Sequence, residues 1–154
     1  LSFAGVPALY FHSLFGTRGD PQAVQRTGHL RSINRQKLNR IELESEMATA
    51  GSIRAQIFGG LGGLIRARQS LEALDPSATQ ECLDLGPQVF GMRRTAASGR
   101  WLVCLAEVAG LPAQISLDVS SGGVDRLSGE RVSLDAVNLA PHQARWIDVT
   151  AGSA

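Results

Sequence analysis

The residues of this 154-residue chain best suited to chemistry are basic and lie close together. From Arg26 to Arg40 the sequence carries five fixed positive charges and no acidic side chain. Four of the five are arginines, whose planar guanidinium group pairs with phosphate or carboxylate through two parallel hydrogen bonds. The segment therefore predicts an anionic ligand, although a solvated basic loop that balances Glu42, Glu44 and Glu46 explains the pattern equally well. Nucleic acid is disfavoured, because the segment lacks an aromatic residue for base stacking and the net charge is only +1.

The remaining polar side chains form no recognisable catalytic set. The alternating glutamates at 42, 44 and 46 are expected to form a charged, solvent-facing surface rather than the paired acids of glycoside chemistry. Asp20, which precedes Pro21, is expected to form a turn first and to contact a ligand second. The sequence contains no G-x-S-x-G and no H-E-x-x-H motif, so neither a hydrolytic triad nor a metal site nor a cofactor is predicted.

Cysteine usage and hydropathy bear on the compartment. Cys82 and Cys104 lie 22 residues apart in apolar, strand-like runs without a C-x-x-C motif, which predicts buried thiols in a reducing, cytoplasmic environment rather than a disulfide. No apolar run approaches the ~18 residues that a membrane span needs, so no membrane partner is predicted. The segment after Leu1 also lacks the basic region of a signal peptide.

Three elements are expected to position residues 26–40. Residues 5–15 are almost continuously apolar and end at a glycine, which predicts a strand buried on both faces, as in a parallel sheet. Residues 16–47 show no sustained apolar period and are expected to form a long functional loop with at most short helical turns. Residues 52–74 place apolar side chains on one helix face, with Ser52 as the N-cap and Asp75-Pro76 as the end.

The predicted helix contains four central glycines, which weaken an isolated helix by about 1 kcal/mol each relative to alanine. They are Gly59, Gly60, Gly62 and Gly63. A phosphate-binding G-x-G-x-x-G fingerprint is disfavoured, because Ile65 stands where a glycine is needed and no strand directly precedes the run. Close packing of this helix against a neighbour is the expected role of the glycines.

After Pro76 the apolar period becomes two, which predicts an antiparallel all-β module. The expected strands are residues 81–85, 89–93, 101–108, 115–119, 131–134 and 145–149. The charge balance changes at the same point, from +3 up to Asp75 to −2 beyond it. Two regions are therefore expected, residues 1–76 and residues 77–154.

Two motifs in the first region resemble a known family. Residues 5–16, GVPALYFHSLFG, and residues 27–35, TGHLRSINR, closely resemble the end of the catalytic barrel in sucrose phosphorylase-like enzymes of the α-amylase superfamily. Residues 124–130 and 139–147 resemble the last strands of that superfamily's C-terminal β-domain. The resemblance implies that residues 1–76 are the last strand, active-site loop and helix of a TIM (β/α)8 barrel. It implies that residues 77–154 form an antiparallel β-sandwich.

The same resemblance implies an activity. Family enzymes retain the anomeric configuration by double displacement, with an Asp nucleophile, a Glu acid/base and a stabilising Asp that would all precede Leu1. The chain is thus expected to be a fragment, without catalytic residues, of a retaining α-glucoside phosphorylase. Its partners would be inorganic phosphate and a sugar substrate, sucrose or a related glucoside such as glucosylglycerate. A fragment of an α-amylase-type hydrolase or transglucosidase, or a non-catalytic carbohydrate-binding β-module, remains an alternative.

The resemblance also suggests which side chains meet substrate. It implies that Arg31 faces the acceptor subsite. Arg18, Asp20, His29 and Arg35 are further candidates for binding substrate or phosphate, because they lie on the same loop. Fixed guanidinium charge would offset the repulsion between phosphate and acidic catalytic groups.

Overall fold

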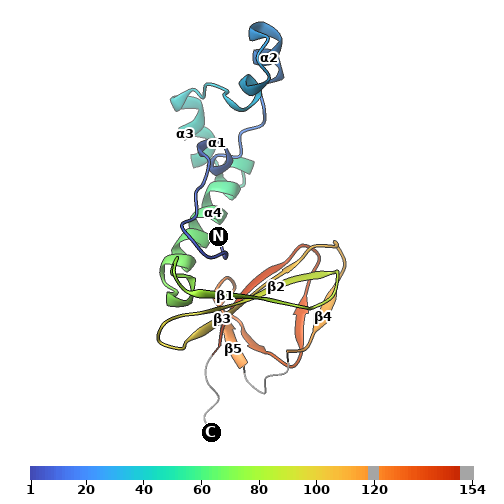
Figure 1. Cartoon of the computed structure of the whole chain (residues 1–154). Helices are drawn as coiled ribbons and strands as arrows, with labels where there is room; N and C mark the ends of the chain where they lie inside the picture. The colour runs from blue at the N-terminus through green and yellow to red at the C-terminus, as the bar shows by residue number, and fades with distance from the viewer. Residues whose placement is uncertain (118–121, 150–154) are drawn as a thin grey trace. The chain divides into compact units, whose positions relative to one another are not determined.

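The computed structural model describes residues 1–117 and 122–149, and the chain divides into two compact units (Figure 1). One unit combines Leu1–Pro7 with Ile65–Ala154, and the other is Ala8–Leu64. The boundary falls inside helix α4, Ile53–Gln69.

The unit Ala8–Leu64 is helical. Before α4 it contains α1 (Phe11–Leu14), α2 (Pro21–Thr27), the 3-10 helix η1 (Leu30–Asn34) and α3 (Arg40–Ala48). Helix α2 begins with a proline at its first position, and the Asp20 carboxylate accepts the Ala23 amide at 2.9 Å as an N-cap. Asn39 caps α3 in the same way, accepting the Ile41 amide at 2.9 Å. The predicted loop over residues 16–47 is therefore more helical than expected.

The strand predicted for residues 5–15 is wrong. Residues 6–10 have no regular secondary structure, and Phe11–Leu14 form α1. Apolar side chains in this stretch are exposed, Val6 by 84% and Phe11 by 54%. A strand is held by ladder hydrogen bonds to neighbours, and no described strand pairs with this stretch. The last barrel strand that the resemblance implies therefore does not form in the described residues, whereas the expected helix and β-domain are present.

Helix α4 confirms the helix expected over residues 52–74, with an earlier end. Ser52 is the predicted N-cap and accepts the Ala55 amide at 3.1 Å through its hydroxyl. The chain turns after Gln69 and continues as a short 3-10 helix, η2 (Glu72–Leu74). A Cβ atom added at Gly59, Gly60 or Gly63 would meet no described atom within 4 Å. The close packing predicted for these glycines is therefore not made within the described part of the chain.

The other unit is built on antiparallel strands, as predicted. In the described residues they are β1 (Thr79–Leu83), β2 (Val89–Thr95), β3 (Trp101–Glu107), β4 (Ala113–Ile115), β5 (Gly122–Asp125), β6 (Arg131–Ser133), β7 (Val137–Leu139) and β8 (Ala144–Val149). Six form one sheet in the order β1-β2-β3-β8-β5-β6, while β4 pairs with β7 in a second, two-stranded sheet. Strands β5 and β7 are additional to the expected set. The strand expected at 115–119 overlaps β4 only at Ile115, since Ser116 and Leu117 have no regular secondary structure, and Asp118 and Val119 lie outside the described residues.

The six-stranded sheet has buried side chains on both faces, because neighbours in sequence point to opposite sides of a strand. Val103 and Leu105 of β3 belong to a cluster with residues of β7 and β8. Leu102 and Cys104, which alternate with them along β3, are buried on the opposite face. The 3-10 helix η2 contacts β2 and β3. The module thus has a sandwich core and a second buried layer.

Two buried arginines fasten the first residues of the chain to this unit. The Arg94 side chain is fully buried and donates to the carbonyl oxygens of Ser2 at 2.6 Å, Asp75 at 2.8 Å, Ala78 at 3.2 Å and Thr79 at 3.3 Å. The Arg68 guanidinium donates to the carbonyl oxygens of residues 1, 3 and 5. Burial and the nearby Arg68 charge lower the pKa of Arg94. Backbone carbonyl oxygens therefore accept the described hydrogen bonds of both cations, and the Asp75 carboxylate adds a favourable charge interaction with each.

The two cysteines are free thiols in different surroundings. Cys104 is buried as predicted, and burial raises its pKa to about 12. Cys82 is exposed, contrary to prediction. It lies on β1, which is an edge strand of the sheet and exposes four of its five residues.

Candidate functional site

The five residues predicted to bind substrate lie on the segment that contains α2 and η1, inside the helical unit (Figure 1). Arg18 precedes α2 and Asp20 is its N-cap residue. His29 and Arg35 flank η1, and Arg31 lies within it. All five therefore lie on one continuous stretch, residues 17–35, which forms α2, a turn and η1 and which we name the basic segment.

Hydrogen bonds within the unit hold this segment together. The Asp20 amide donates to the Ile33 carbonyl oxygen at 2.7 Å, which joins the start of α2 to η1. The hydroxyl groups of Thr27 and Ser32 lie 2.9 Å apart. Helix α2 ends on Gly28, whose φ of 67° lets the chain reverse toward η1. The arginines are thus carried on a defined backbone.

Two of the five side chains differ from the others in what they contact. The Asp20 carboxylate accepts the Ala23 amide and lies 3.6 Å from the Arg26 guanidinium, so it stabilises α2. The exposed His29 contributes through its backbone, because its amide donates to the Thr27 hydroxyl at 3.3 Å and its carbonyl oxygen accepts the Ser32 amide at 3.0 Å. Neither contact requires a ligand.

Arg18, Arg31 and Arg35 are exposed, and among the described residues no carboxylate pairs with any of them. The glutamates of α3 are directed elsewhere. Glu44 pairs with Arg40 at 2.7 Å, and Glu46 pairs with Arg54. The idea that these glutamates balance the basic segment is therefore not supported for Arg18, Arg31 and Arg35.

Sequence reasoning missed the side chain that links the basic segment to the preceding stretch. The Tyr10 hydroxyl donates to the Asn34 carbonyl oxygen at 2.6 Å. The two residues are 24 positions apart, and one partner is a backbone atom that carries no sequence signature. Only the aromatic character of residues 10 and 11, which suggested a buried strand, marked this position.

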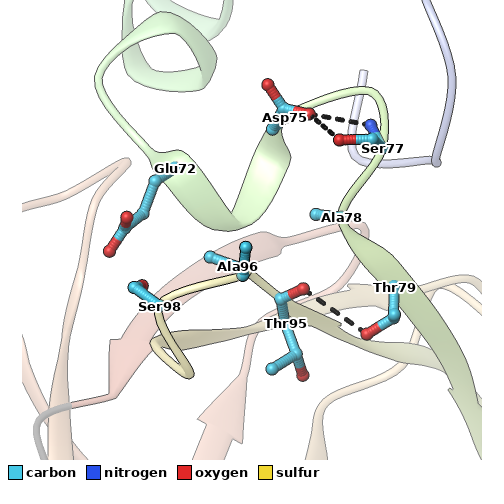
Figure 2. Close-up of a pocket in the computed structure, with 9 residues that line it drawn as sticks. Glu72, Asp75, Ser77, Ala78, Thr79, Thr95, Ala96 and Ser98 are labelled. Carbon is cyan, nitrogen blue, oxygen red and sulfur yellow. Dashed lines mark hydrogen bonds between the residues drawn. The ribbon is translucent and has the colours of Figure 1, made fainter.

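A cavity of about 450 Å³ lies in the other unit, and none of the predicted site residues lines it. Its polar lining includes Glu72, Asp75, Ser77, Thr79, Thr95 and Ser98, and Figure 2 shows these side chains around it. The lining is largely internally paired: Asp75 accepts the amide and hydroxyl of Ser77, and the Thr79 hydroxyl donates to the Thr95 carbonyl oxygen at 3.4 Å. The Ser77 hydrogen bonds lower the pKa of Asp75. These contacts explain the lining as a structural junction before β1.

The described residues contain no group of three or more His, Cys, Asp or Glu side chains that could hold a metal ion. Within those residues, no helix combines the length and apolarity that crossing a membrane requires.

Comparison with known proteins shows similarity in sequence and in fold. No family model matches the chain. The chain is 36% identical over 110 residues to a protein of Spirochaeta thermophila named glucosylglycerate phosphorylase, covering 71% of this chain and 19% of the relative. It is 33% identical over 148 residues to a protein of the same name from Allomeiothermus silvanus, covering 96% of this chain and 25% of the relative. The chain therefore spans a fifth to a quarter of the length of these relatives.

Solved structures agree with the sequence comparison at the level of the fold. Trehalulose synthase MutB from Pseudomonas mesoacidophila MX-45 matches with a TM-score of 0.53 and 17% identity, covering 74% of this chain and 21% of that one. The fold is thus that of C-terminal parts of α-amylase superfamily enzymes. Within that class, the chain corresponds to the C-terminal part of a sucrose phosphorylase-like enzyme.

Proposed function

We propose that this chain is the acceptor-side and C-terminal portion of a retaining α-glucoside phosphorylase. The complete protein would transfer a glucosyl group from glucosylglycerate, sucrose or a related glucoside to inorganic phosphate. Two relatives named glucosylglycerate phosphorylase, one matching along 96% of this chain, support the proposal. In it, residues 1–76 complete a catalytic barrel and residues 77–154 form its β-domain.

The observation that carries the proposal is the set of three exposed arginines of the basic segment without carboxylate partners. A phosphorylase must bind phosphate where a hydrolase admits water, next to acidic catalytic groups. Guanidinium groups free of internal ion pairs can supply the compensating charge and a bidentate hydrogen-bonding fork. An acidic aglycone such as glycerate would use the same groups in the reverse reaction.

Arg31 is assigned the direct contact with the acceptor anion. Arg18 and Arg35 are assigned supporting positive charge, because both are exposed at the ends of the same segment. Asp20 and His29 are assigned a supporting role without direct contact to the anion, since their described contacts are with the backbone and side chains of the segment itself. The residues that form and break the glycosidic bond are assigned to the part of the protein that would precede this chain.

The test compares phosphorolysis with hydrolysis of one glucoside by the complete protein, in wild type and in Arg31→Ala. We expect the phosphate-dependent rate to fall about 10- to 150-fold, the loss of one charge-assisted contact worth roughly 1.5 to 3 kcal/mol, while hydrolysis is retained. Arg31→Lys should recover little, because an ammonium group cannot form the planar fork. Arg126→Ala is the matched control, since Arg126 is exposed in the β-domain and its side chain has no described partner.

Two results would contradict the assignment. An equal loss of both activities means that Arg31 supports the fold of the segment, and unchanged activities return it to a solvated surface residue. A complete protein that hydrolyses or transfers glucosyl groups but never uses phosphate would favour the hydrolase or transglucosidase alternative. The isolated chain is expected to produce no glucose 1-phosphate from sucrose and phosphate.

A further inference from the structure

The 3-10 helix η1 is held at three consecutive residues directly after Arg31. The Ser32 hydroxyl lies 2.9 Å from the Thr27 hydroxyl, and the Ile33 carbonyl oxygen accepts the Asp20 amide at 2.7 Å. The Asn34 carbonyl oxygen accepts the Tyr10 hydroxyl at 2.6 Å. Anchors from three different points of the chain therefore converge on one short helix.

Gly19 permits the closest of these approaches. A Cβ atom at this position would lie 2.8 Å from Cγ1 of Ile33 and 3.3 Å from the Ile33 carbonyl oxygen. The first distance is shorter than side chains tolerate, so the Ile33 side chain would have to change rotamer or shift, and the approach to the backbone oxygen is also tight. The same carbonyl oxygen accepts the Asp20 amide. A side chain at Gly19 therefore crowds both the Ile33 side chain and the carbonyl oxygen through which Asp20 anchors η1.

Arg31 makes no described side-chain contact that could orient it. The backbone of η1, which the three anchors hold, therefore sets the point and the direction of the Cα–Cβ bond from which the Arg31 side chain reaches out. From this arrangement we infer that Tyr10 and Gly19 are positioning residues for acceptor recognition. They hold η1 so that the Arg31 fork meets an oxyanion in a two-point geometry. The inference rests on the proposed function, because it gives Arg31 the acceptor contact.

This role predicts a selective effect. A bidentate guanidinium contact depends on orientation, so loosening η1 weakens binding of phosphate or a carboxylate acceptor. Water needs no such contact, so hydrolysis of the same glucoside is spared. The signature is a rise in the KM for phosphate with a smaller change in kcat, which a general loss of folded protein does not produce.

The first experiment uses Tyr10→Phe in the complete protein, which removes one hydroxyl and keeps the ring that lies 5.3 Å from the His12 ring. We expect the KM for phosphate to rise roughly 2- to 12-fold, as for one net hydrogen bond, with hydrolysis unchanged. Thr49→Val is the matched control. It removes a hydroxyl that donates to a backbone carbonyl oxygen at 2.9 Å in the same unit, but at the end of α3.

A double-mutant cycle tests whether Tyr10 acts through Arg31. In the Arg31→Ala background, Tyr10→Phe should have no further effect on phosphate use, because the group that it positions is gone. Gly19→Ala should produce the same selective rise in KM by a different route. Gly59→Ala serves as its control, since a Cβ atom there meets no described atom within 4 Å.

The outcomes separate this inference from the proposed function. If Arg31→Ala changes the ratio of phosphorolysis to hydrolysis but Tyr10→Phe and Gly19→Ala do not, only the positioning role is overturned. Additive losses in the double mutant also overturn it, because Tyr10 would then act independently of Arg31. If Arg31→Ala leaves the ratio unchanged, the acceptor contact assigned to Arg31 is wrong and this inference falls with it.

Discussion

Replacing Arg94 with methionine should strongly destabilise the β-domain. Arg94 has no measurable exposure and donates to four backbone carbonyl oxygens, those of Ser2, Asp75, Ala78 and Thr79. Methionine fills a similar volume but donates no hydrogen bond. The substitution therefore leaves the carbonyl oxygens of Ser2, Asp75, Ala78 and Thr79 without this donor.

The size of the effect follows from these contacts. A hydrogen bond to a charged group contributes about 1.5 to 3 kcal/mol, and the four bonds are not independent. Methionine also avoids the cost of burying a cation, and those carbonyl oxygens that reach solvent can hydrate. We therefore expect a net loss of about 3 kcal/mol. With an m value of about 2 kcal/mol per M, the urea midpoint should fall by about 1.5 M.

Tryptophan fluorescence is a suitable assay, because Trp101 and Trp146 both lie in the unit that contains Arg94. Arg100→Met is the control: Arg100 is exposed and bridges Glu72 and Asp148 at 3.5 and 3.0 Å, a surface arrangement worth about 0 to 1 kcal/mol. If the midpoint of Arg94→Met lies as close to wild type as that of Arg100→Met, the buried guanidinium does not stabilise this unit and the reasoning fails.

Three further predictions concern stability. The Glu107 carboxylate accepts hydrogen bonds from the backbone amides of His142 and Ala109, and these bonds lower its pKa below the ordinary 4.5. The contribution of Glu107 to the free energy of unfolding is therefore complete above pH 4.5 and is lost as the pH falls through the folded-state pKa. Glu107→Gln should therefore flatten the acid side of the urea stability profile, and an unchanged profile would contradict this. Gly59→Ala should raise helicity and stabilise the isolated chain by roughly 0.5 to 1 kcal/mol in thermal circular dichroism, because the added Cβ is unobstructed. Gly123→Ala should instead destabilise it, because a Cβ there would lie 2.6 Å from the Asp148 carbonyl oxygen, and stabilisation by Gly123→Ala would refute the packing argument.

The β-domain was predictable because its signals are local. Alternation with a period of two and glycine or proline between the runs mark strands whose partners are also in the chain. Residues 5–15 carry an equally clear strand signal, yet no described strand pairs with them. An apolar run indicates a segment that would be stable as a buried strand. It does not indicate whether a neighbouring strand is present to pair with it. The caps of α2 and α3, Asp20 and Asn39, were readable signals that the absence of an apolar period obscured.

The candidate site shows the same division between local and distant information. Composition located the basic run of residues 26–40, but residue type could not separate Arg31 from Arg68 and Arg94. These arginines differ in whether hydrogen-bond acceptors of the protein contact the guanidinium group. Arg68 and Arg94 are buried, and their guanidinium groups are occupied by backbone carbonyl oxygens. Arg31 is exposed, has no described acceptor and sits on a backbone held from Tyr10. A guanidinium without an internal partner on an anchored backbone is equipped to bind an external anion, whereas one saturated by carbonyl oxygens can only hold the fold.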